Sequence, residues 1–244
     1  MIPFIAIFVG WIVQGLLGIG SGIISTGILL FFYDPKTVVV SLSVIALLGT
    51  AYLTVINYRG KFFLKDTLLL IFFSFIGVGI GSFFLEALDH RKIELIFGII
   101  VFLTGLYDFY AQRKRIFIQG KHKTVFGVMT GISGGIVSGL TGGAGPLYAL
   151  YLNQTVHNKK DFKFLLSLIF TALNIERIFF YSISPQLLQL FDLQILLPGV
   201  LAVFSGAYIG NKLTGKLSTQ RFKESVSISI TVFGIYFIYR SITV

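Results

Sequence analysis

Charged residues and cysteine are what this sequence has least of. Of its 244 residues, 12% are Asp, Glu, Lys or Arg and none is cysteine, whereas a soluble domain has about 25% charged residues. So little charge excludes a soluble enzyme and a disordered chain, because neither a water-facing surface nor a solvated coil can be built from it. The absence of cysteine excludes a disulfide scaffold, an iron–sulfur cluster and thiol catalysis. With 55% hydrophobic residues, the composition predicts a polytopic membrane protein.

Acidic residues are also scarce, with 10 Asp and Glu against 20 Lys and Arg, so the formal net charge is +10. In a soluble protein this excess would suggest a nucleic-acid partner. Here the basic residues fall between apolar stretches, which is the pattern of the positive-inside rule. The sequence therefore indicates the lipid bilayer as partner and no nucleic acid.

Motifs for cofactors and catalysis are missing. The three histidines are scattered over loops, which indicates no metal site. No phosphate-binding Walker A sequence occurs, so a built-in ATPase is not expected. No nucleophile–base or metal set stands in the apolar stretches, so an intramembrane enzyme is disfavoured. We therefore expect no enzyme activity and no cofactor.

Eight apolar stretches make up most of the chain. Six of them are about the 20 residues that a helix needs to cross the membrane, and two are about 30 residues long. In order they are residues 2–32, 37–57, 66–86, 93–111, 124–153, 164–183, 193–212 and 224–242.

The two long stretches are interrupted by small residues. The first contains the glycine-rich run 15–22, and the second contains the run 138–146, which ends in Pro146. Glycine costs about 1 kcal/mol relative to alanine inside a helix, and proline suits the first turn of a new helix. Two half-helices joined by an irregular link are therefore predicted in each stretch. The alternative is an unbroken helix whose glycines allow close packing.

Similar glycine patterns recur in the two halves of the chain. Gly-Leu-Leu-Gly at 15–18 aligns with Gly-Leu-Thr-Gly at 139–142, 124 positions later, and Ser43 then aligns with Ser167. At a spacing of 129, Gly77-xxx-Gly81 aligns with Gly206-xxx-Gly210, and residues 105–107 align with residues 234–236. The common order predicts a two-fold internal repeat. Its parts are an N-terminal repeat over 1–111, a basic linker over 112–123 and a C-terminal repeat over 124–244.

The charges of the loops predict how the two halves are oriented. Basic residues concentrate in the loops 58–66, 112–123, 154–163 and 213–223. If all eight stretches crossed the membrane once, these loops would be split between its two faces, against the positive-inside rule. If the two long stretches are re-entrant hairpins, all four loops are cytoplasmic and both termini are external. The predicted fold is therefore an all-α membrane protein of two inverted repeats, each a broken hairpin followed by three transmembrane helices.

Two hairpins that enter from opposite faces would bring their tips together near the midplane. Each tip presents the N-terminal end of a half-helix, whose free N–H groups favour an anion. Discontinuous helices of this kind mark substrate sites in transporters, although neighbouring helices alone could also stabilise such a break. The candidate ligands at the tips are Gly18, Gly20, Ser21, Gly22, Ser25, Thr141, Gly142, Gly143 and Gly145.

Polar side chains inside the apolar stretches are further candidates. Asn174, Glu176 and Arg177 lie in the stretch 164–183, and ionisable residues within the membrane are functional hypotheses by default. Arg177 could neutralise an anion and Glu176 could carry a coupling proton. The alternative is that both snorkel to the outer interface. Ser43 and Ser167 could line the cavity or make ordinary helix–helix hydrogen bonds.

These features resemble the TauE/SafE sulfite exporter family. The likeness rests on a glycine-rich hairpin in each half, the run Gly-Leu-Thr-Gly-Gly-Ala-Gly-Pro at 139–146 and the two Gly-xxx-Gly pairs. The N-terminal copy departs from this motif, since Gly22 and Ile23 stand where the proline would fall. The resemblance implies a small transporter in the cytoplasmic membrane that moves sulfite, sulfoacetate or another organosulfonate.

The function predicted from these features is secondary export of a small sulfur-containing anion by alternating access around the two tips. An anion channel, or a carrier of another small organic anion, is the alternative. Nothing in the sequence indicates the oligomeric state.

Overall fold

The fold is all-helical in the residues that the computed structural model describes, which are 1–58, 64–111, 121–156, 159–213 and parts of 231–242. This confirms the predicted all-α class. The helices are α1 (Ile2–Leu17), α2 (Ser21–Leu29), α3 (Pro35–Asn57), α4 (Leu64–Ala87), α5 (His90–Ala111), α6 (Lys121–Thr141), α7 (Gly145–Thr155), α8 (Lys159–Ile183), α9 (Pro185–Leu188) and α10 (Leu193–Leu213). Of the predicted stretch 224–242, residues 224–230 lie outside the described ones, and those described from 231 on are helical.

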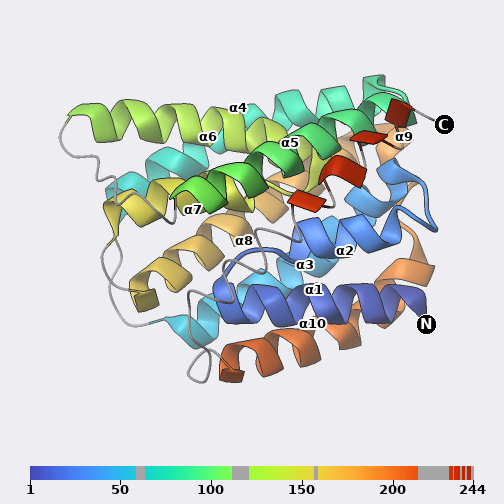
Figure 1. Cartoon of the computed structure of the whole chain (residues 1–244), viewed down its shortest axis with the longest axis horizontal. Coiled ribbons are helices and arrows are strands. Elements are labelled where there is room, and N and C mark those ends of the chain that lie inside the picture. Colours follow the sequence, from blue (N-terminus) through green and yellow to red (C-terminus); the bar gives the residue numbers. More distant parts are fainter. Residues whose placement is uncertain are drawn as a thin grey trace.

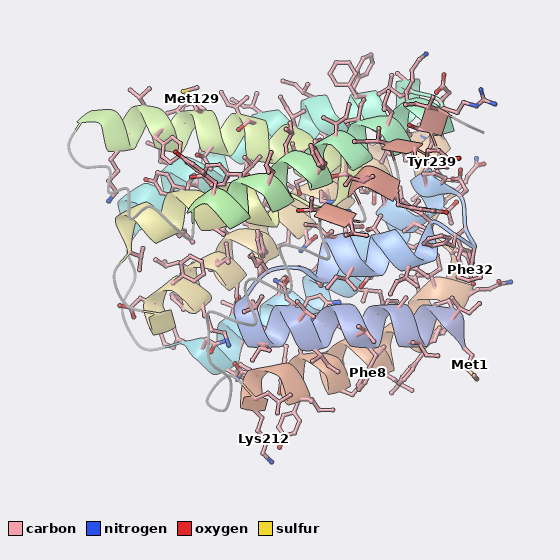
Figure 2. The ribbon with its side chains drawn as sticks, viewed as in Figure 1. Met1, Phe8, Phe32, Met129, Lys212 and Tyr239 are labelled. Carbon is pink, nitrogen blue, oxygen red and sulfur yellow. The ribbon has the colours of Figure 1, made fainter. Side chains whose placement is uncertain are left out.

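The lengths of the helices and the apolar outer surface of the bundle fit a membrane environment. Within the described residues, five helices are long and apolar enough to cross a membrane, and they belong to α3, α4, α6, α8 and α10. Large apolar side chains cover the outside of the bundle; Met129 on α6 is 63% exposed and points away from it (Figure 2). A surface of this kind needs lipid around it, so the chain is a multi-pass membrane protein.

Both long apolar stretches are broken into two helices, as predicted. In the first, α1 ends before Gly18, which has φ +84°, and α2 begins at Ser21. In the second, α6 ends before Gly142, which has φ +73°, and α7 begins at Gly145. The left-handed backbone, which glycine adopts without a Cβ penalty, turns the chain at both places.

Each pair of helices forms an antiparallel hairpin. In the first hairpin, the Ser25 hydroxyl donates to the carbonyl oxygen of Ala6 near the start of α1, and Ser21 contacts Gln14 near its end. In the second, the Tyr148 hydroxyl on α7 donates to the carbonyl oxygen of Gly131 on α6. In each hairpin the first helix is the long arm and the second is the short arm.

The two hairpins enter the bundle from opposite ends (Figure 1). One end, here called the terminal end, holds Met1, the end of α2 and the starts of α3, α5 and α10. The other, here called the lysine-rich end, holds the end of α7 and the starts of α4, α6 and α8, with Lys65, Lys121, Lys123, Lys159, Lys160, Lys163 and Lys212. Of the four basic loops, residues 59–63, 112–120, 157–158 and 214–230 lie outside the described ones.

The two halves of the chain are interlocked. The long arm α1 packs on α10, and the long arm α6 packs on α4. The paired glycines lie at these crossings: a Cβ at Gly206 would lie 2.6 Å from the carbonyl oxygen of Phe8, and one at Gly81 would collide with that of Ile136. Small residues let helices approach this closely in membranes. Each hairpin is therefore held by a helix from the other half.

Candidate functional site

The two hairpin tips meet inside the bundle. A Cβ added at Gly22, in the first turn of α2, would lie 2.5 Å from the carbonyl oxygen of Gly142 at the other tip. Only glycine permits this approach, since any side chain would push the tips apart. The sequence therefore places the start of one short arm directly against the turn of the other hairpin.

The first tip is held by one buried side chain of its own long arm. The amide nitrogen of Gln14 donates to the carbonyl oxygen of Gly18 at 2.8 Å. Its amide oxygen accepts from the backbone N–H and the hydroxyl of Ser21, both at 3.1 Å. Gln14 is 2% exposed, so it joins the two ends of the break in a place without bulk water.

The second tip is held differently. The Thr141 hydroxyl donates to the carbonyl oxygen of Val137 at 2.9 Å and accepts from the N–H of Gly143 at 3.2 Å. Gly142 faces α8, because a Cβ there would lie 2.9 Å from a guanidinium nitrogen of Arg177. The second tip thus depends on a neighbouring helix as well as on its own residues.

A cavity of about 50 Å³ lies between the tips and the middle of α3 and α8. Eight of the predicted site residues line it: Gly20, Ser21, Gly22, Gly142, Gly143, Gly145, Asn174 and Arg177. The other lining residues are Gln14, Ile23, Ala46, Thr50, Ser138, Ala144, Phe170 and Leu173. Half of the lining residues therefore belong to the two tips, and the other half belong to α1, α3, α6 and α8.

Four residues that line this cavity carry unpaired backbone donors at the starts of the two short arms. Within the described residues, the N–H groups of Gly22 and Ile23 in α2 and of Ala144 and Gly145 at α7 have no protein acceptor. These are the first-turn groups that no helix can satisfy internally. Two positive helix ends therefore converge on one small volume.

Arg177 supplies the cavity with a full positive charge. The side chain is 2% exposed. One terminal nitrogen donates to the side-chain oxygen of Asn174 at 2.9 Å, the other to the carbonyl oxygen of Val39 at 2.8 Å, and Nε to the hydroxyl of Tyr181 at 3.3 Å. All three acceptors are neutral, and among the described residues no carboxylate lies within ion-pair distance. The guanidinium is held in position while its charge is left uncompensated.

Glu176 points away from the cavity, although it precedes Arg177. Its carboxyl oxygens lie 3.0 and 3.2 Å from the hydroxyl of Ser74 on α4, and the residue is 7% exposed. Neighbours on a helix point about 100° apart, which separates the two groups. Both residues are buried, so the alternative that they snorkel to the outer interface is wrong.

Five other predicted residues do not line the cavity. Ser25, Ser43, Ser167 and Thr141 each donate to a backbone carbonyl, that of Ala6, Val40, Lys163 and Val137, respectively. Gly18 faces the side chain of Leu166 on α8. The bonds of Ser43, Ser167 and Thr141 stay within their own helices, and that of Ser25 joins α2 to α1. These hydroxyl groups therefore stabilise the helices and do not line the cavity.

Two important residues were missed from sequence. Gln14 is a polar side chain within an apolar stretch and could have been found by the same reasoning that singled out Asn174. Tyr181 is completely buried and its hydroxyl donates to the carbonyl oxygen of Gly139 at 2.5 Å. Tyrosine is common near membrane interfaces, so nothing in the sequence distinguished this one.

The chain is similar to a known protein family. A family model described as Sulfite exporter TauE/SafE matches residues 2–237. No curated protein and no solved structure matches the chain significantly.

Proposed function

The chain belongs to the TauE/SafE sulfite exporter family, and from this premise we propose that it exports a small sulfur-containing anion across the cell membrane by alternating access around the two tips. Sulfite, sulfoacetate and other organosulfonates are the candidate substrates. The observation that carries the proposal is the uncompensated charge of Arg177 in the cavity between the tips.

The free energy of burying Arg177 argues for an anionic ligand. An arginine at the centre of a membrane helix costs at least about 2.5 kcal/mol on insertion scales. Its neutral hydrogen-bond partners reduce that cost but leave the charge in place. An anion beside it would offset the charge and would also accept from the free N–H groups of Gly22, Ile23, Ala144 and Gly145.

The size of the cavity favours a very small anion. Its 50 Å³ correspond to the space of roughly three to five water molecules. Sulfite, with one sulfur and three oxygens, is close to this size, whereas sulfoacetate would need the tips to move apart. We therefore propose sulfite as the preferred substrate of this conformation.

The orientation follows from the positive charges. We propose that the lysine-rich end is cytoplasmic and that the two halves are inverted repeats, which the opposite directions of the hairpins support (Figure 1). Outward movement of an anion is then favoured by the inside-negative potential, by about 2.3 kcal/mol per charge for each 100 mV. No ATP is required for export.

Glu176 is proposed to couple transport to a proton. Its carboxyl group is buried against Ser74, and among the described residues no cation pairs with it. A buried carboxyl group of this kind can exchange a proton while the neighbouring Arg177 holds the anion. The two groups lie on one helix, so a movement of α8 affects both.

Thermal unfolding of the purified protein tests the binding site. We expect sulfite to raise the melting temperature, with stabilisation of about 2.7 kcal/mol at 100 times its Kd. The variant Arg177→Gln should lose this shift, while Ser205→Ala, which removes an exposed hydroxyl on α10, should keep it. A parent protein that no sulfur anion stabilises would contradict the proposal.

Reconstituted vesicles test the transport mode. Labelled sulfite should enter vesicles preloaded with unlabelled sulfite faster than empty ones, and the flux should saturate. Conductive current without saturation would instead support the channel alternative.

A further inference from the structure

Near its end, each long arm accepts a hydrogen bond from a side chain of α8. Gly15 stands two residues before the end of α1, and Gly139 stands two residues before the end of α6. The Lys163 amine donates to the carbonyl oxygen of Gly15 at 2.7 Å, and the Tyr181 hydroxyl donates to that of Gly139 at 2.5 Å. Lys163 and Tyr181 lie near opposite ends of α8, and Arg177 lies between them.

The Lys163 contact joins three elements at the lysine-rich end. Besides Gly15, the amine donates to the side-chain oxygen of Asn211 on α10 at 2.9 Å. The first tip also rests on α8 here, because a Cβ at Gly18 would meet Leu166 at 3.5 Å and Lys163 at 3.8 Å. The contact therefore holds the first hairpin against α8 between the cavity and the lysine-rich end.

The Tyr181 contact lies on the other side of the cavity. Tyr181 belongs to an apolar cluster that includes Val40, Leu140 and Leu187 and lies toward the terminal end. Its hydroxyl accepts from Nε of Arg177 while donating to Gly139, and the guanidinium lies 5.6 Å from its ring. The second hairpin is thereby linked through one hydroxyl to the charge in the cavity.

We propose that Lys163 and Tyr181 are positioning residues that close the cavity toward the lysine-rich end and the terminal end, respectively, and that transport breaks these contacts in turn. The inference rests on the proposed transport function. An anion that draws the guanidinium of Arg177 into the cavity weakens its bond to Tyr181, and so loosens the contact toward the terminal end. When the contact toward the lysine-rich end is the broken one, Lys163 no longer donates to Gly15. Its amine is then a cationic partner for an anion that arrives from that end.

The competing explanation is ordinary helix capping. The last carbonyl groups of any helix need donors, and a cation there also interacts favourably with the helix dipole. Capping alone predicts that loss of either donor lowers stability and leaves access to the cavity equal from both sides. The two explanations therefore predict the same loss of stability. They differ in whether access to the cavity increases from one side only.

Side-specific labelling distinguishes them. The chain has no cysteine, so Ser138→Cys places a single thiol in the cavity wall. A membrane-impermeant thiol reagent then measures access to the cavity from each side. When Lys163→Met is added to Ser138→Cys, we expect the thiol to be labelled about tenfold faster from the lysine-rich end than in Ser138→Cys alone, as for loss of one charged hydrogen bond. From the terminal end the labelling rate should not change. Tyr181→Phe should show the opposite preference.

Matched variants and a binding measurement complete the test. Lys163→Arg should restore slow labelling, Asn211→Ala should weaken the same contact in part, and Ser205→Ala should change nothing. If Tyr181→Phe fails to fold, Lys163→Met and Asn211→Ala still decide the proposal. Equal acceleration from both sides, or none, in variants that sulfite still stabilises overturns the proposal. A parent that no sulfur anion stabilises overturns the transport function instead.

Discussion

The two hairpin tips share one architecture and are stabilised in different ways. The first tip is held by Gln14 from its own long arm, which bonds to Gly18 and Ser21 on both sides of the break. The second tip has a short local bond at Thr141, and Gly142 lies against Arg177 of α8. The first tip is therefore a self-contained turn. The second is coupled to the charged group of the cavity, so a ligand on Arg177 acts on it first.

The largest effect is expected from a side chain at the second tip. Gly142→Ala would force a Cβ into a left-handed backbone, at 2.9 Å from the guanidinium of Arg177, so anion binding should be lost. Gly18→Ala is the matched variant at the first tip, where the Cβ would meet its nearest neighbour at 3.5 Å. It should cost about 1–2 kcal/mol of stability from backbone strain alone and keep binding. Thermal unfolding with and without sulfite measures both, and equal binding by the two variants would refute the difference between the tips.

A smaller effect is expected from removing the bridge at the first tip. Gln14→Leu leaves the carbonyl group of Gly18 and the N–H of Ser21 without partners, which costs about 1–3 kcal/mol for a buried polar group. Thr141→Val, at the second tip, leaves one backbone N–H group, that of Gly143, without its partner and should cost less than Gln14→Leu, which affects two backbone groups. Chemical unfolding in detergent compares the two. A larger loss for Thr141→Val would show that the first tip does not depend on Gln14.

The proton proposal is tested by a variant that leaves both tips intact. Glu176→Gln keeps the size of the side chain and its bond to Ser74, so stability and sulfite binding should stay near the parent's. Flux driven by a pH difference across the vesicle should disappear in the variant while sulfite exchange continues. Flux that still responds to the pH difference would exclude Glu176 as the proton carrier.

The orientation of the two hairpins is tested without perturbing function. Val156, just after α7, lies at the lysine-rich end, and Phe32, just after α2, lies at the terminal end. With an impermeant reagent on intact cells, Phe32→Cys should label and Val156→Cys should label only after lysis. Labelling of Val156→Cys from outside would contradict the proposed orientation.

Much of the fold could be predicted because its signals are local in the chain. The glycine runs at 15–22 and 138–146 contain both breaks, since a poor helix former weakens a helix wherever it packs. The pairs Gly77–Gly81 and Gly206–Gly210 lie at helix crossings, where only a missing side chain allows contact. Arg177 was singled out because a buried charge is rare enough to need a reason.

Other parts of the site could not be predicted, because they depend on which atoms meet across helices. Ser43 and Ser167 were candidates for the cavity, yet each bonds to a carbonyl within its own helix. Lys163 belonged to a basic loop in the sequence, and only the packing of α8 against α1 and α10 brings its amine to Gly15 and Asn211.

The sequence by itself determined a membrane protein with two broken hairpins and one intramembrane cation, because hydropathy, helix propensity and charge are properties of single residues and short runs. Only the tertiary structure decided that the tips meet through Gly22 and Gly142, that Glu176 faces Ser74 while Arg177 faces the cavity, and that α8 holds both long arms. These features arise from contacts between residues far apart in the chain, and their geometry is set by helix packing rather than by any local pattern.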